Sequence, residues 1–84
     1  MRIEGRVRQF IVENFYVSDP SDLADDTLLV TSGVIDSTGM LELIAFVETE
    51  FGVRIEDEEM TPENLESISR IAAFVAHKRR AAVG

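Results

Sequence analysis

An aspartate and a serine, Asp36 and Ser37, stand directly before an amphipathic run that extends from Met40 to Phe51. Either can act as a helix N-cap, because a cap needs a side-chain oxygen that accepts from free backbone N–H groups. If Asp36 is the cap, Ser37 becomes the first helical residue and its hydroxyl lies at the positive helix end. A phosphate ester there would lie near free N–H groups and a favourable dipole. The pair is therefore suited to carry a phosphodiester, although a duplicated cap without further meaning is the simpler interpretation of Asp-Ser alone.

Other residues that could do chemistry are few. The chain has no cysteine and one histidine, His77, and no serine or threonine is spaced to form a nucleophile–base pair with it. The acidic run from Glu56 to Glu59 could attract a divalent cation, but it lacks the alternating ligands and central glycine of a calcium loop. We therefore expect a protein that is not an enzyme and holds no metal, with His77 in a structural or surface role.

Length and charge narrow the class of protein further. The 84 residues correspond to a single domain over residues 1–84, and 45% of them are apolar, which is enough for a core. The net charge of −8 opposes binding to nucleic acid and favours basic partner proteins. No signal peptide and no apolar run of the roughly 18 residues that span a bilayer is seen. We expect a soluble, cytoplasmic monomer.

The apolar periodicity predicts an all-α fold, a small bundle of three main helices plus one short helix. The helices are expected at about residues 2–15, 37–50, 61–65 and 68–80. A proline turn at 18–22 and a long loop over about 17–35 separate the first two helices. In that loop, five apolar residues are expected to hold it on the core: Leu23, Leu28, Leu29, Val34 and Ile35.

Single residues predict where these helices begin and end. Gly52 is expected to end the second helix as a left-handed cap. Thr61 and Ser67 are expected to cap the third and fourth helices, with Pro62 at the first helical position. Seven residues are expected in the core: Met40, Leu41, Ile44, Val47, Ile68, Ile71 and Val75.

Three segments in this order, GVIDS (33–37), LELI (41–44) and ETEFGV (48–53), resemble the acyl carrier protein family. Members of that family carry Asp-Ser at the start of their second helix, a Glu-Leu pair one turn later and a Glu-rich end that closes in Phe-Gly. The resemblance extends over nearly the whole chain. It implies an acyl-carrier-protein-like bundle.

The resemblance also implies a function. Ser37 would receive 4′-phosphopantetheine from coenzyme A through a phosphopantetheinyl transferase, and Asp36 and Thr38 would flank the attachment point. The cofactor's thiol would hold acyl or aminoacyl cargo as a thioester and deliver it in fatty-acid or specialised-metabolite biosynthesis. Asp36 would position the serine for the transferase through its magnesium-dependent site.

Partner enzymes would meet the exposed part of the second helix. The docking residues implied are Met40, Leu41, Glu42 and Glu48. Their partners would be the transferase, an acyl- or aminoacyl-loading ligase, and synthase or transferase enzymes with basic docking patches. An unmodified acidic helical adaptor that binds a basic partner is the alternative.

The residues after the serine depart from the fatty-acid carrier pattern, in which Leu and then an acid are common. Here Thr38 and Gly39 follow, and Asp-Ser-x-Gly resembles D-alanyl carrier proteins and some stand-alone aminoacyl carriers. This favours a specialised carrier with a dedicated ligase. Gly39 would remove a side chain beside the arm, either for closer partner contact or through neutral drift. Phe46 and Phe74 are expected to fill the space between the helices, which would favour a small or polar cargo.

Overall fold

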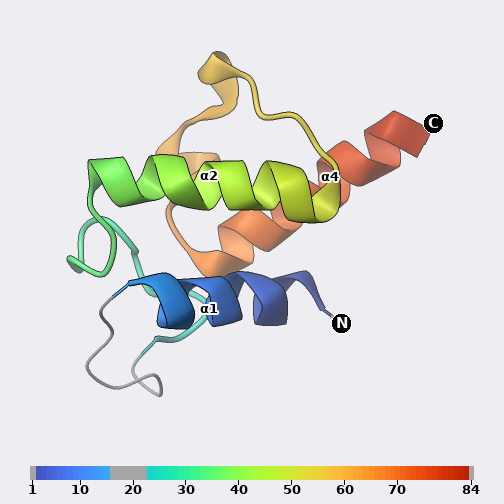
Figure 1. Ribbon diagram of the computed structural model, residues 1–84. Helices are drawn as coiled ribbons and strands as arrows, with labels where there is room; N and C mark the ends of the chain where they lie inside the picture. Colours follow the sequence, from blue (N-terminus) through green and yellow to red (C-terminus); the bar gives the residue numbers. More distant parts are fainter. Residues whose placement is uncertain (1, 16–22, 84) are drawn as a thin grey trace.

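The computed structural model describes residues 2–15 and 23–83, and in these segments every regular element is helical (Figure 1). The elements are α1 (Ile3–Asn14), α2 (Ser37–Phe51), the 3-10 helix η2 (Asp57–Glu59), α3 (Pro62–Leu65) and α4 (Ile68–Val83). The all-α bundle of three main helices plus one short helix is thereby confirmed. The predicted proline turn at 18–22 lies outside the described residues. Within the described part, no helix is long and apolar enough to cross a membrane.

The helices surround one core to which α1, α2 and α4 each contribute. α4 packs against α1 and α3, and α1 also contacts α2. Figure 1 shows α4 running obliquely across the other helices, with its C-terminal end extending past α2. The apolar stripe of each main helix faces inward, and its fully buried members are Val7 and Ile11, Leu43 and Val47, and Ile68, Ile71 and Val75.

The described part of the loop before α2, residues 23–36, is held on the bundle by both side chains and backbone. Leu23, Leu29 and Ile35 are buried, as predicted, and Val34 is half-buried. The backbone N–H of Leu29 donates to the carbonyl of Glu66 at 2.8 Å. Leu28 differs from the prediction, because its side chain is 43% exposed.

Most helix ends follow the local chemistry of the sequence. Gly52 adopts the left-handed conformation after α2, with φ 65° and ψ 36°, as predicted. Ser67 caps α4 as predicted, because its hydroxyl oxygen accepts from the Arg70 N–H at 3.2 Å. Thr61 stands at the N-cap of α3, but its side chain makes no capping hydrogen bond. The first turn of α3 depends instead on Pro62, whose ring fixes a helical φ.

Leu41 was expected in the core and is the largest exception, because 62% of its side chain is exposed. Its neighbours on α2 explain why. Leu43 and Val47 are buried in the core, and Leu41 lies to one side of that stripe. Met40 is half-buried, whereas Ile44 and Val47 are buried as predicted.

Candidate functional site

The start of α2 presents one serine hydroxyl to solvent. Asp36 is the N-cap, with extended backbone, and its Oδ1 accepts from the Gly39 N–H at 2.7 Å. The Met40 N–H donates to the Asp36 carbonyl at 2.9 Å and begins the helical ladder. Ser37 is therefore the first helical residue, and its side chain is exposed. The N–H groups of Ser37 and Thr38 have no acceptor within the helix, so this end attracts negative charge.

The loop before α2 fixes where this end lies. Gly33 adopts φ +86°, which turns the chain toward α2 at a position where other residues are strained. Ile35 follows two residues later, buried, and its N–H donates to the Leu29 carbonyl at 3.0 Å. Asp36 thus follows directly on a residue that is anchored in the core.

Gly39 is buried and faces the protein, which corrects both sequence-based interpretations of this residue. A Cβ atom at Gly39 would lie 2.6 Å from Cε1 of Phe15, closer than real Cβ atoms approach other atoms. An alanine here would force the Phe15 ring to shift, which favours packing over partner contact or neutral drift as the reason for glycine at this position. Phe15 is a residue that the sequence analysis missed. Two features of the sequence could have indicated the contact. Gly39 weakens the first turn of the second helix, and an aromatic residue, Phe15, stands at the end of the first helix.

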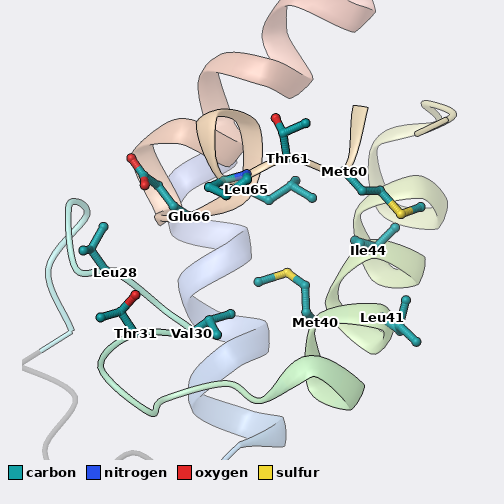
Figure 2. A pocket seen from close by; sticks show the side chains of 11 residues that line it. Leu28, Val30, Thr31, Met40, Leu41, Ile44, Met60, Thr61, Leu65 and Glu66 are labelled. Carbon is teal, nitrogen blue, oxygen red and sulfur yellow. The ribbon is translucent and has the colours of Figure 1, made fainter. Parts of the chain in front are cut away.

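Ser37 shares one face of α2 with an open apolar groove. Residues three, four and seven positions along a helix lie on the same face, and these are Met40, Leu41 and Ile44. All three line a groove of about 390 Å³ between α2, α3 and the loop. Figure 2 shows the Met40 side chain extending from α2 into the space between this helix and the segments that carry Val30 and Leu65. The groove thus begins one helical turn after the serine.

The opposite face of α2 is sealed by aromatic rings. Phe46 stacks on Phe10 of α1, with ring centroids 4.2 Å apart, and meets the edge of Phe51 at 6.2 Å. Phe10 in turn contacts Phe15 edge-on at 6.0 Å. Phe46 therefore does not fill the groove. Phe74 is buried in the core cluster, against which Phe46 also packs, and it does not line the groove either. Both rings thus fill space between the helices, and the small or polar cargo that they favour stays a prediction.

The residues implied in docking differ in what they are free to contact. Glu42 and Leu41 are exposed on α2. Glu48 is half-buried, and its Oε2 accepts from the backbone N–H of Ile55 at 2.8 Å. The Glu48 carboxylate therefore stabilises the segment that follows α2, whereas the Glu42 side chain is exposed to solvent.

The acidic run 56–59 has a structural role. Glu56 and Glu59 form a reciprocal capping box around η2. The two Glu59 carboxylate oxygens accept from Nζ of Lys78 on α4, at 2.9 and 3.1 Å. These bonds from Lys78 and the Glu56 N–H lower the pKa of Glu59. Among the described residues, no three acids or histidines come together as metal ligands, and His77 is exposed on α4.

Comparisons with known proteins identify the family. The family model for the phosphopantetheine attachment site matches residues 5–75. D-alanyl carrier proteins of Streptococcus sanguinis and Streptococcus thermophilus are 32% and 31% identical over 71 residues, which is 84% of this chain and 89% of theirs. The solved structure of KstB-PCP in its apo form has a TM-score of 0.71 at 41% identity, covering 92% of this chain and 86% of that one.

A second solved chain agrees with this assignment of the fold. It belongs to a crystal structure described as that of an FAD-dependent dehydrogenase, with a TM-score of 0.67 and 29% identity over 87% of this chain and 97% of that one. The family model covers most of the sequence, and the relatives match nearly from end to end. The chain therefore belongs to the phosphopantetheine-attachment family and is a non-catalytic carrier protein with a covalently attached 4′-phosphopantetheine.

Proposed function

We propose that Ser37 is the attachment point of the 4′-phosphopantetheine and that the chain carries an amino acid on it as a thioester. The observation that supports the attachment point best is the Asp36 cap. The Asp36 carboxylate accepts a hydrogen bond from the Gly39 N–H and so forms the N-cap. Ser37 is therefore the first residue of α2, and its side chain is exposed. A phosphodiester on that oxygen would lie beside the N–H groups of Ser37 and Thr38.

The residues around Ser37 fit the cofactor. The hydroxyl is free to accept the phosphate, and the apolar groove on the same face begins one turn later. When bound, the cofactor supplies the thiol that forms the thioester, which this cysteine-free chain lacks. Only one oxygen of Asp36, Oδ1, is used in the cap. We infer that Oδ2 is left to orient the magnesium ion of the transferase toward the Ser37 hydroxyl.

An amino acid is the cargo that the relatives favour over a fatty acid. The Streptococcus proteins are described as D-alanyl carrier proteins, and Asp-Ser-x-Gly resembles that group. Phe46 and Phe74 do not line the groove, so neither ring limits the space beside Met40 and Leu41. The proposal of aminoacyl cargo therefore rests on the relatives and on the residues after Ser37.

A dedicated ligase and the transferase are the partners we propose, with docking on the exposed face of α2. Glu42 offers a carboxylate for Arg or Lys of a partner, and Leu41 beside it offers apolar surface, being 62% exposed. Exposed charges of this kind mainly raise association rates, which suits a carrier that must release each partner. Glu48 is assigned a lesser part in docking because its carboxylate is engaged with Ile55.

The cargo is tested by loading the holo protein in parallel with two enzymes. One reaction contains D-alanine, ATP and a D-alanine–carrier ligase from Streptococcus, and the other contains malonyl-coenzyme A and a fatty-acid-pathway acyltransferase. We expect a thioester-linked alanine mass in the first reaction and none with Ser37→Ala in either. Loading with malonate alone would overturn the aminoacyl assignment and leave the carrier assignment intact.

A further inference from the structure

Phe15 connects the end of α1 to the first turn of α2. It is the C-cap of α1, and its N–H donates to the Ile11 carbonyl at 2.9 Å. Its ring is half-buried and packs edge-on against Phe10, with an angle of 70° between the ring planes. Phe10 is itself stacked on Phe46. The position of the Phe15 ring is therefore fixed by both α1 and α2.

The ring reaches α2 at the point where the cap is formed. A Cβ atom at Gly39 would lie 2.6 Å from Cε1 of Phe15, 3.1 Å from Oδ1 of Asp36 and 3.1 Å from Cγ2 of Ile35. The same glycine donates its N–H to Oδ1 of Asp36 at 2.7 Å. The backbone of Gly39 is thus surrounded by the Phe15 ring, the Asp36 carboxylate and the buried Ile35 side chain.

Ser37 lies two positions before Gly39, so its side chain points to nearly the opposite side of the helix. Phe15 consequently touches neither the Ser37 hydroxyl nor the groove that begins beside it. Any effect of Phe15 on the serine must pass through the backbone of the first turn and the Asp36 cap.

We propose that Phe15 is a positioning residue for the attachment reaction: by packing on Gly39 it holds the first turn of α2 and the Asp36 carboxylate in the geometry that the transferase needs at Ser37. The proposal rests on the proposed function of Ser37. A transferase acts on this turn as a substrate, and a displacement of about 1 Å of a reacting group lowers rates by up to about a hundredfold. Glycine is otherwise unfavourable in a first turn, so the ring contact accounts for its presence at position 39.

A pair of substitutions tests the contact itself. Gly39→Ala introduces the clash, and Phe15→Leu removes the Cε atoms that cause it. The readout is transfer from coenzyme A by a broad-specificity phosphopantetheinyl transferase, with kcat and KM for the carrier measured separately. We expect Gly39→Ala to lower kcat by roughly ten- to a hundredfold, with a smaller change in KM because the exposed face of α2 is unaltered. The double variant should recover to within about threefold of Phe15→Leu alone.

Ala73→Gly provides the matched control, because Ala73 is exposed on α4, away from the cap and from the docking face of α2. It weakens helix propensity without touching the site, so its thermal midpoint should fall while its transfer rate stays that of the wild type. If circular dichroism shows that Gly39→Ala does not fold, Phe15→Ala replaces it. That variant leaves the ring's space empty, and we expect it to lower kcat several-fold, with Phe15→Leu recovering most of the rate.

Three outcomes would overturn the proposal: a Gly39→Ala rate equal to that of the wild type, a double variant as slow as Gly39→Ala, or rates that follow thermal stability across all variants, Ala73→Gly included. The proposed function of Ser37 would fail separately, because in that case the wild type itself would gain no cofactor on Ser37.

Discussion

The two long faces of α2 differ in how completely they are covered. On one face, Phe46 stacks on Phe10 of α1 and meets Phe51 edge-on, and Gly39 lies against the Phe15 ring. On the other face, Met40 and Leu41 border a groove that stays open. The first face fixes where α2 lies on the bundle. The second face, which Ser37 shares, is left free for the cofactor and for partner enzymes in the function proposed above.

This difference shows how a small domain can combine a firm attachment point with changing contacts. Aromatic pairs and close packing stabilise the closed side, and they extend to the first turn of α2 through Phe15. The open side can then exchange partners at little cost to the fold. The predictions below test whether stability and function divide between the faces in this way.

Truncation on the two faces should give the largest contrast in stability. Phe46→Ala removes a stacked ring and is expected to lower the free energy of unfolding by about 3 kcal/mol. Leu41→Ala removes an exposed side chain and should change that free energy by less than about 0.5 kcal/mol. Urea unfolding followed by circular dichroism measures both, and equal losses for the two variants would contradict the division into faces.

The two acids on α2 should separate into a structural and a docking residue. Glu48→Ala leaves the Ile55 N–H without its acceptor and is expected to lower the free energy of unfolding by about 1 kcal/mol. Glu42→Ala should leave stability unchanged within about 0.5 kcal/mol, because Glu42 is exposed.

Association kinetics give the complementary test of Glu42. Glu42→Lys should slow association with the transferase at low salt, and the difference from the wild type should shrink as salt is added. Stopped-flow measurements at two ionic strengths would show this. A Glu48 variant that slows association as strongly while keeping full stability would reverse the two assignments.

The smallest expected effect concerns Glu59 of η2, which pairs with Lys78 on α4. The lowered pKa of Glu59 means that its pairing with Lys78 stabilises the fold fully above the ordinary carboxyl pKa of 4.5. That contribution is lost as the pH falls below 4.5 and through the lowered pKa. Glu59→Gln keeps an acceptor for the capping box but lacks the charge.

Unfolding measured for wild type and Glu59→Gln from pH 7 downward tests this dependence. The wild type should be slightly more stable by a constant margin at pH 6 to 7, and the margin should vanish in acid. A margin that grows as the pH falls would show that the carboxylate is not held by Lys78.

Local chemistry explains which features were predictable from the sequence. The Gly52 helix end and the Ser67 cap each depend on neighbours within three residues, so residue types alone indicated them. For the cap of α2 the residue types left two candidates, Asp36 and Ser37, and the structure shows that it is Asp36. The all-α bundle followed from the period of the apolar residues, because each stripe must be buried.

The features that were missed depend on residues far apart in the chain. Leu41 was placed in the core because its spacing fits the apolar stripe, yet it is 62% exposed. The direction of Phe46 was set by Phe10 on α1, and the need for Gly39 was set by Phe15. These contacts arise only from the way α1 and α2 pack, which the sequence pattern of either helix does not contain.

The central claim is that Ser37 receives the cofactor, and intact mass spectrometry tests it most directly. The purified apo protein is incubated with coenzyme A, magnesium and a broad-specificity phosphopantetheinyl transferase, and the product is digested to locate any added mass. We predict a single phosphopantetheine on the peptide that contains Ser37, and none on Ser37→Ala. An unmodified wild-type chain beside a fully modified control carrier, or a cofactor on another residue, would contradict the account, and the first of these results would favour an unmodified acidic adaptor.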